Sequence, residues 1–478
     1  MEFLLTNRPR YYFRQISDIP RASRNEKAIC EYIAAFAKSQ GLEYKTDEAY
    51  NIIVNKPAAK GYEDAPAIIL QAHTDMVCEK NKGVEHDFDK DPLDLYVDEE
   101  GFLHARGTTL GADDGYGVAY MLAILEDTTL KHPALQCAFT SMEEIGLLGA
   151  QKLKKEDFYG KHYINLDAGG EDQTAVSSSG GTRTKIERKL AFEENDVPSY
   201  TLRIRGLQGG HSAGMIHLER GNAIQIAARV LYALSEKCDD LKLCDFNGGD
   251  KINAIPRECD VTFCTHKDLS EIRTCAQALI DQIGKELQYS DAGFHAFLEE
   301  TAKCDKSLSI EDSRQIINFL YVLPNGLQHR SMAIEGLSVA SLNLGAIAFE
   351  NDSLRINHLI RSAAASHGDQ MIAQLAILSE NFGFHFEVIS RYYGWDYEKD
   401  SPFRNILKEV LKEKGIEMKE HASHGGLECG VFKGMIPELD LISYGPISEG
   451  AHSPQEKMDL SSFDRCYDTL VKVLENAK

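Results

Sequence analysis

The chain lacks the features that mark membrane, secreted and disulfide-stabilised proteins. No apolar run approaches the roughly 20 residues that a transmembrane helix needs. Residues 1–8 do not show the basic-then-apolar order of a signal peptide. The 11 cysteines include no Cys-x-x-Cys pair, and their odd number argues against a disulfide scaffold. These absences predict a cytoplasmic protein with reduced thiols and no membrane partner.

Positive charge is also scarce. The chain has 52 Lys and Arg against 74 Asp and Glu, which gives a net charge of −22. A nucleic-acid partner is therefore not expected, because phosphate binding needs a basic surface. The acidic run 85–100 is typical of a solvated loop or sheet edge. With 478 residues and an apolar fraction of 43%, the chain is predicted to be folded into two or three domains.

The first third of the chain alternates between helix and strand patterns. Helical spacing of apolar residues covers 25–40 and 115–125, and a glycine-punctuated helix is expected near Gly149. Short apolar runs that predict buried strands lie at 52–54, 67–70, 134–140 and 163–166. This alternation predicts an α/β fold with a doubly wound, mostly parallel sheet and helices on both faces.

From about Thr182 the pattern changes to that of an inserted α+β domain. Strands are expected at 200–205, 252–265, 339–349 and 355–360, and helices at 221–236 and 369–378, with two βαβ-like halves but no clear sequence repeat. The α/β pattern resumes after Trp395. We therefore expect residues 1–185 and 391–478 to form one discontinuous domain, with residues 186–390 as the insertion.

Histidines and carboxylates stand where several of these strands end. His73-Thr74-Asp75 follows a strand, and residues i and i+2 of an extended chain point the same way. Asp75 can therefore hydrogen-bond the back nitrogen of the His73 ring and fix its tautomer. Taken alone, this segment would more often be a strand-end histidine packed against a loop.

Two pairs of carboxylates strengthen the pattern. Asp113-Asp114 lies in a glycine-rich turn before an apolar helix, where an ordinary N-cap is the alternative. Two metals need a ligand that reaches both, and Asp113 is the candidate for that bridge. Glu143-Glu144 follows a strand, and two buried glutamates repel each other unless cations or protons intervene. One of the pair can then bind metal while the other faces the attacking water.

Asp167 and His452 complete a set that suits two metal ions. Ligands of doubly wound sheets gather at the carboxyl ends of strands. Zinc binds imidazole nitrogen and carboxylate oxygen, and its catalytic sites keep a position for water. Two Zn²⁺ ions are offset by Asp113, Glu144, Asp167 and a hydroxide. The residues therefore predict a dinuclear zinc hydrolase, in which Co²⁺ or Mn²⁺ can substitute because they accept the same ligands.

Three longer motifs carry a resemblance to a known family. They are Leu-Gly-Ala-Asp-Asp-Gly at 110–115, Ser-Met-Glu-Glu-Ile-Gly-Leu-Leu-Gly-Ala at 141–150, and Gly-Gly-Leu-Glu-Cys-Gly at 425–430. The chain resembles the superfamily of co-catalytic zinc peptidases that includes aminoacylases and carnosinases. Over essentially its whole length it is most similar to the aminoacyl-histidine dipeptidase branch. Gly115, where many members of the superfamily have lysine, fits that branch.

The resemblance implies a catalytic α/β domain, an inserted lid and defined roles for the site residues. One zinc would be held by His73, Asp113 and Asp167, and the other by Asp113, Glu144 and His452. Glu143 matches the general base, Asp75 matches the partner of His73, and the Asp113–Asp114 peptide bond is expected to be cis. Because all five ligand positions are present, an inactive relative is not expected.

The resemblance also implies that the lid contributes to substrate binding. His211 matches a histidine that stabilises the oxyanion, and Asn253 matches an asparagine that contacts the substrate. Arg361 matches an arginine that grips the terminal carboxylate, which guanidinium pairs bidentately. Without the resemblance, an arginine at a strand end is more often in a surface ion pair. The lid is expected to hinge near 182–186 and 390–394.

The last motif provides further candidates for substrate binding. Gly425 and Gly426 could bring backbone N–H groups close to a bound peptide. Glu428 could bind a free substrate amine, and a structural hydrogen bond is an equal alternative.

The expected function is hydrolysis of unblocked dipeptides, including Xaa-His peptides such as β-Ala-His, with Glu143 as the general base of a metal-bridged hydroxide. A tripeptidase or an N-acyl amino acid deacylase of the same superfamily is the first alternative. A non-catalytic, metal-dependent scaffold that binds peptides is the second. Nucleic-acid processing by two metals conflicts with the charge. A homodimer is expected from the extended lid.

Overall fold

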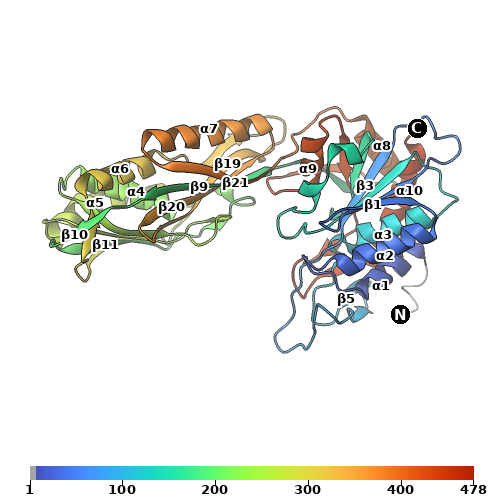
Figure 1. The fold of residues 1–478 in the computed structure, drawn as a ribbon, viewed down its shortest axis with the longest axis horizontal. Helices are drawn as coiled ribbons and strands as arrows, with labels where there is room; N and C mark the ends of the chain where they lie inside the picture. Colours follow the sequence, from blue (N-terminus) through green and yellow to red (C-terminus); the bar gives the residue numbers. More distant parts are fainter. Residues whose placement is uncertain (1–6) are drawn as a thin grey trace. The chain divides into compact units, whose positions relative to one another are not determined.

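The computed structural model describes residues 7–478, which form two compact units (Figure 1). Unit 1 contains the chain up to Ser178 together with Trp395–Ala422 and Leu427–Lys478, and unit 2 contains Ser179–Gly394 with Ser423–Gly426. Residues 1–6, which belong to the segment without a signal-peptide pattern, lie outside the described residues. Within 7–478, no helix combines the length and the apolar character needed to cross a membrane.

Unit 1 is built on a six-stranded sheet with the order β1-β2-β6-β3-β7-β23. Strands β6, β3, β7 and β23 run parallel to one another, whereas β1 and β2 are antiparallel. The helices of this unit are α1 (Arg8–Ser17), α2 (Lys27–Ser39), α3 (Ala112–Glu126), α8 (Pro402–Glu413), α9 (Glu428–Met435) and α10 (Leu460–Asn476). The sheet strands are β1 (Glu43–Thr46), β2 (Ile52–Lys56), β3 (Ile68–His73), β6 (Leu135–Thr140), β7 (His162–Asn165) and β23 (Asp440–Ser443).

The central strands are apolar because both faces of the sheet are covered. Every residue of β3 and β6 is buried. Ile68 and Leu70 belong to a core that also includes residues of α2, α3, α8 and α10. The opposite face packs on α9, where the rings of Tyr163 and Phe432 lie 4.7 Å apart. The doubly wound α/β fold predicted from the sequence is therefore confirmed.

The smaller strands of unit 1 form two further sheets, β24-β25-β5-β4 and β22-β8. Their bounds are β4 (Leu95–Val97), β5 (Phe102–Ala105), β8 (Gln173–Ser178), β22 (Lys419–Ser423), β24 (Ser448–Glu449) and β25 (Lys457–Asp459). The loop between β24 and β25 carries His452.

Unit 2 is an antiparallel nine-stranded sheet with four helices and is α+β, as predicted. Its path is β16-β11-β15-β13-β19-β20-β9-β21, and β18 also pairs with β19. The strands are β9 (Gly180–Lys189), β11 (Ser199–Arg205), β13 (Lys242–Gly248), β15 (Cys259–Cys264), β16 (His295–Glu300), β18 (Gly326–Arg330), β19 (Ser338–Glu350), β20 (Ser353–Ser362) and β21 (His385–Tyr392). The helices are α4 (Ala223–Ser235), α5 (Leu269–Glu286), α6 (Ile310–Val322) and α7 (Ala365–Asn381). Two short pairs are β10 (Phe192–Glu194) with β17 (Lys306–Leu308), and β12 (Gly210–His211) with β14 (Ala254–Ile255).

The sheet of unit 2 consists of two halves with the same topology. The main elements β11-α4-β13-β15-α5-β16 form one βαββαβ half, and β9-α6-β19-β20-α7-β21 form the other. When the four main strands of each half are numbered in chain order, both halves have the strand order 4-1-3-2. The halves meet where β13 pairs with β19, and the first is inserted between β9 and α6 of the second. A structural duplication is therefore present, although no sequence repeat indicated it.

Two expectations about local structure need correction. The helix expected near Gly149 is a single 3₁₀ turn, Ala150–Lys152, because Gly146 and Leu147 just before it have φ of +110° and +59°. The strand expected at 252–265 is divided into β14 and β15, and Pro256 between them has no N–H to donate.

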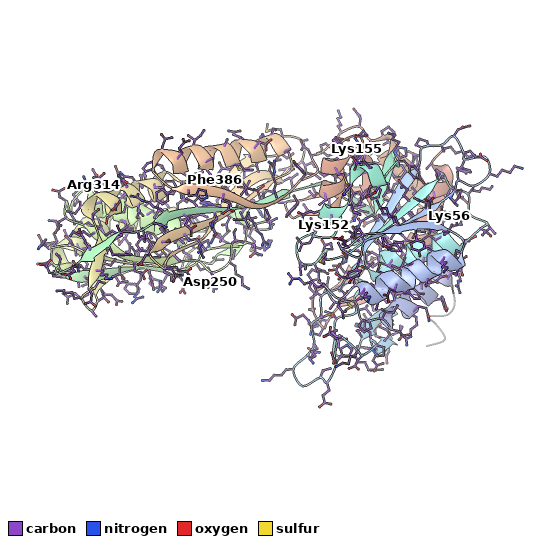
Figure 2. All side chains as sticks on the ribbon, viewed as in Figure 1. Lys56, Lys152, Lys155, Asp250, Arg314 and Phe386 are labelled. Carbon is purple, nitrogen blue, oxygen red and sulfur yellow. The ribbon has the colours of Figure 1, made fainter. Side chains whose placement is uncertain are left out.

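The domain boundaries expected at 185/186 and 390/391 fall inside strands. Strand β9 pairs with β20 along its whole length, from Gly180↔Ser362 to Lys189↔Ser353. The division between the units lies instead after Ser178 and after Gly394. Figure 2 shows the side chains of both units, with Lys56 and Lys152 in unit 1 and Asp250, Arg314 and Phe386 in unit 2.

Candidate metal centre and active site

The predicted metal ligands of unit 1 come together at the carboxyl ends of the parallel strands. His73 is the last residue of β3, Glu144 follows β6, and Asp167 follows β7. Asp113 lies in the first turn of α3, where its φ and ψ are not helical, and its peptide bond to Asp114 is cis, as expected. His452, in the loop after β24, has a φ of +63°.

Asp113 lies between the two histidines and presents one oxygen to each. Its Oδ1 is 2.9 Å from His73 Nε2, and its Oδ2 is 3.3 Å from His452 Nε2. His73 Nε2 is also 4.0 Å from Asp167 Oδ2, and His452 Nε2 is 3.0 Å from Glu144 Oε2. A carboxylate that lies between two imidazoles in this way could bridge two metal ions.

Three overlapping groups of side chains could each hold a metal ion. Within each group the candidate ligand atoms lie within 4.8 Å of one another. Two groups are the sets named from the sequence, His73-Asp113-Asp167 and Asp113-Glu144-His452. The third is His73-Glu143-Glu144, which places the Glu143 carboxylate beside the same cluster.

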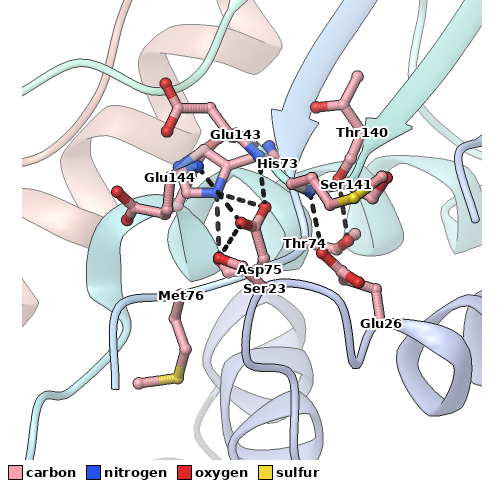
Figure 3. Close-up of polar contacts among 12 residues, drawn as sticks. Ser23, Glu26, His73, Thr74, Asp75, Met76, Thr140, Ser141, Glu143 and Glu144 are labelled. Carbon is pink, nitrogen blue, oxygen red and sulfur yellow. Dashed lines mark hydrogen bonds and ion pairs between the residues drawn. The ribbon is translucent and has the colours of Figure 1, made fainter. Parts of the chain in front are cut away.

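Asp75 supports both sides of this cluster (Figure 3). Its carboxylate accepts hydrogen bonds from the backbone N–H groups of Glu143 at 3.0 Å and Glu144 at 3.3 Å, and from Ser23 Oγ at 2.7 Å. The expected contact with His73 is also present, with 3.6 Å between His73 Nδ1 and Asp75 Oδ1. However, His73 Nδ1 lies closer to the Asp75 backbone oxygen, at 3.1 Å. Asp75 therefore positions the two glutamates as well as the histidine.

The two histidines have raised pKa values in the metal-free protein. Burial opposes the charge on His73, but hydrogen bonds to Asp113 and Asp75 raise its pKa well above the ordinary value. For His452, hydrogen bonds to Asp113 and Glu144 raise the pKa to about 10. Each imidazolium lies where a cation is favoured by the surrounding carboxylates.

The carboxylates are crowded beyond what the two histidines neutralise. Burial, followed by the charge of Asp113, raises the pKa of Asp167 well above its ordinary value. Burial also raises the pKa of Glu143 to about 8. The buried Oε1 of Glu144 has no hydrogen-bond partner among the described residues. Imidazole nitrogens, crowded carboxylates and an unsatisfied oxygen together fit a site for divalent cations.

In unit 2, His211 lies in β12 and Asn253 lies just before β14, the strand that pairs with β12. His211 in β12 pairs with Ala254 in β14, and the N–H of Ser212 donates to Asn253 O at 2.9 Å. Asn343 Nδ2 donates to Ala254 O at 2.8 Å and to Ile252 O at 2.9 Å, which ties this loop to β19. Both predicted side chains, His211 and Asn253, are exposed.

Arg361, in β20 of the second half, is a buried guanidinium without a carboxylate partner among the described residues. It is 7% exposed, and its Nε has no hydrogen-bond partner within 7–478. Burial lowers its pKa, while a hydrogen bond to Tyr392 acts in the opposite direction. Desolvation, followed by the charge of Arg361, lowers the pKa of His211. Within residues 7–478, Arg361 therefore does not form the surface ion pair that was considered for it.

The glycines of the last motif pack tightly within unit 2. The N–H of Gly425 donates to Ser423 Oγ at 2.9 Å, so this donor is already engaged. A Cβ on Gly426 would lie 2.7 Å from the hydroxyl oxygen of Tyr392. The preceding His424 has both ring nitrogens satisfied, by Ser179 Oγ at 2.8 Å and Ser341 Oγ at 2.7 Å.

Glu428 belongs to unit 1 and is fully buried. Its Oε2 accepts hydrogen bonds from Gln71 Nε2 and from Thr140 Oγ1, the latter at 2.9 Å. Its Oε1 has no partner among the described residues, and burial raises its pKa to about 8. These contacts correspond to the structural alternative, with one oxygen left unused.

Comparison with known proteins identifies the family. The profile described as peptidase family M20/M25/M40 matches residues 69–476. The cytosol non-specific dipeptidase of Escherichia coli (strain K12) is 35% identical over 474 residues, which cover 97% of this chain and 96% of the relative. The chain belongs to peptidase family M20/M25/M40. The enzyme class predicted from the sequence, a metallopeptidase, is confirmed at this level.

Two solved structures share the fold. The aminoacylhistidine dipeptidase from Vibrio alginolyticus has a TM-score of 0.91 at 32% identity, with 99% of this chain and 98% of that chain covered. The aminopeptidase PepT from Bacillus cereus ATCC 10987 has a TM-score of 0.56 at 16% identity, with 98% of each chain covered, and shows likeness of fold alone.

Several residues around this M20 site were not found from the sequence. Ser23 contacts Asp75, and Arg21 and Glu456 contact the backbone near Asp113. Gln71 links Glu428 to Tyr163 and Asn165. Glu456 lies in the same loop as His452, and this position near a predicted ligand was a weak signal of its role. Arg21 and Ser23 lie in the loop between α1 and α2, and the sequence of this loop gives no signal of a role at the site.

Proposed function

We propose that this protein is a metal-dependent dipeptidase that hydrolyses unblocked dipeptides, including Xaa-His peptides such as β-Ala-His. The observation that supports it best is the position of Asp113, whose two oxygens face His73 and His452 separately. This geometry suits two divalent cations, with Asp167 completing one ligand set and Glu144 the other. The dipeptidases from Escherichia coli and Vibrio alginolyticus support the choice of substrate class.

The chain's own residues have defined tasks in this proposal. Two bound cations would polarise the scissile carbonyl and lower the pKa of water. Glu143 takes the proton from the attacking water and returns it to the leaving amine. Asp75 keeps Glu143 in place through the backbone N–H, and its contact with His73 maintains the ring orientation. Burial raises the pKa of Glu143 to about 8, which supports a role in accepting a proton.

Unit 2 is proposed to recognise the substrate. Its buried Arg361, which lacks a carboxylate partner among the described residues, suits the terminal carboxylate of a dipeptide. His211 is proposed to stabilise the oxyanion, and Asn253 and Gly426 to contact the peptide. A role for Glu428 in binding the substrate amine stays a prediction, because its free oxygen is buried.

Hydrolysis of a small panel tests the proposal. Purified protein loaded with Zn²⁺ or Mn²⁺ is assayed with β-Ala-His, Gly-His, Ala-Ala, Ala-Ala-Ala and N-acetyl-Ala, with chelator-treated protein as a blank. Cleavage of free-amine dipeptides alone would support the dipeptidase. Cleavage of the tripeptide or the acetylated amino acid would favour the other members of the superfamily. Bound metal without any cleavage would favour a peptide-binding scaffold.

The role of Glu143 has its own test. Glu143→Gln should retain both metals and lose about 10²- to 10⁴-fold in kcat, the range that general acid–base catalysis contributes. Asp113→Asn should lose metal as well, because it weakens the bridge. The measurements are kcat and metal content, with the exposed Glu438 changed to Gln as the matched control. Near-normal kcat in Glu143→Gln would refute the assignment.

Localisation and assembly stay predictions. The cytosolic relative from Escherichia coli supports a cytoplasmic location. The expected homodimer can be checked by light scattering of the purified protein.

A further inference from the structure

The turn that carries Asp113 is held by two buried charged residues that the proposed reaction does not use. They are Glu456, just before β25, and Arg21, in the loop before α2, and each is 2% exposed. Both contact the backbone of this turn rather than the carboxylate of Asp113. They therefore hold the backbone from which the Asp113 side chain extends.

Glu456 gathers four successive backbone N–H groups. Its Oε2 accepts from Leu110 at 2.7 Å and Gly111 at 2.9 Å, and its Oε1 accepts from Ala112 at 2.8 Å and Asp113 at 3.3 Å. These donors lie at the start of α3, where the helix itself provides no acceptors. A carboxylate at this position also interacts favourably with the positive end of the helix dipole. All four bonds depend on the two carboxylate oxygens of one side chain.

Arg21 connects the same turn to the segment that follows His73. Its Nη1 donates to the carbonyl oxygens of Thr74 at 3.0 Å and Asp75 at 3.1 Å, and its Nη2 donates to Gly111 O. A Cβ on Gly111 would lie 2.5 Å from Arg21 Nη2, and Gly111 has a φ of +65°, so glycine is required there. The guanidinium therefore sets the spacing between the His73 segment and the Asp113 turn.

We propose that Glu456 is a positioning residue for the bridging ligand Asp113, with Arg21 as its counterpart on the His73 side. Glu456 and His452 lie on one loop, so the segment that provides one metal ligand also orients the ligand that both metals share. The inference rests on the proposed function for its catalytic consequence. The four hydrogen bonds from the backbone of Leu110–Asp113 to Glu456, which we call the clamp, can be observed without catalysis.

Two measurements on Glu456→Gln test the clamp. The amide can accept from only part of the four donors and turns its NH₂ group toward the rest. In the metal-free protein, amide hydrogen exchange of Leu110–Asp113 should therefore become at least about 10-fold faster, while Glu438→Gln leaves it unchanged. In Co²⁺ titrations, the variant should bind about 10- to 100-fold more weakly, the usual effect of residues that orient metal ligands. Its visible Co²⁺ absorption should also change. Glu456→Asp, which keeps the charge, should lie between the variant and the wild type.

Each result decides the proposal. Unchanged exchange in a folded Glu456→Gln would overturn the clamp. Faster exchange with wild-type Co²⁺ affinity and spectrum would overturn the positioning role and leave Glu456 as a structural residue only. If Glu456→Gln does not fold, Glu456→Asp is judged by the same criteria. If the wild type binds Co²⁺ but cleaves no peptide, the proposed function fails, while the Co²⁺ data still decide the role of Glu456.

Discussion

Metal binding to this site should release protons, and the structure predicts how many. A metal takes a neutral imidazole, so a protonated histidine must lose its proton first. The pKa of His452 is raised to about 10 and that of His73 is well above its ordinary value, so both are protonated at pH 7 in the metal-free protein. Each of the two ions should therefore displace one imidazolium proton, and the raised pKa of Asp167 adds to this number.

The sign and size of the pH dependence follow from this count. Because each ion displaces at least one proton, the apparent affinity for each ion should rise by at least about 10-fold per pH unit between pH 6 and pH 8. A factor of ten corresponds to about 1.4 kcal/mol. Isothermal titration of Zn²⁺ at pH 7, in two buffers with different enthalpies of ionisation, gives the number of protons directly.

Two variants sharpen the measurement. His452→Gln should release about one proton fewer than the wild type. His211→Gln should not change the number, because the pKa of His211 is lowered and its ring is already neutral at pH 7. Heats that are independent of the buffer, together with an affinity that does not change from pH 6 to pH 8, would refute the reasoning.

Two further predictions concern the core and substrate recognition. Leu70→Ala, in the fully buried strand that ends at His73, should lower the free energy of unfolding by about 2–5 kcal/mol, whereas Ile377→Ala at a 59% exposed position should change it by less than about 0.5 kcal/mol. Denaturant titration checks both, and equal effects would contradict the assigned core. Arg361→Met should raise KM for Ala-Ala by about 10- to 100-fold, from the roughly 1.5–3 kcal/mol of a charged hydrogen bond. Kinetics with Ala-Ala and Ala-Ala-amide check this, because the variant should lose the preference of the wild type for the free carboxylate, and an unchanged preference would exclude the role.

The fold could be predicted where the physical pattern is local. The fully buried strands β3 and β6 are continuous apolar runs, which the sequence displays directly. The prediction of a helix near Gly149 was wrong because the backbone conformations of Gly146 and Leu147 do not follow from hydrophobic spacing. The boundary at 185/186 was displaced because the pairing of β9 with β20 joins segments that are far apart in the chain.

The candidate site divides in the same way. The relation of His73 to Asp75 depends on positions i and i+2 at the end of a strand, and the His73 ring and the Asp75 carboxylate lie 3.6 Å apart. By contrast, the contacts of Glu456 with residues 110–113 join the last part of the chain to its first third. Such contacts leave no periodic signal in either segment.

The sequence by itself determined the types of ligand available and the strand ends on which His73, Glu144 and Asp167 stand, because alternating helices and strands place those ends along one edge of a sheet. Only the tertiary structure decided that one oxygen of Asp113 faces His73 and the other faces His452. That arrangement depends on the docking of the loop after β24 against the start of α3. Contacts over such separations are set by the packing of the whole unit and not by any local preference of the chain.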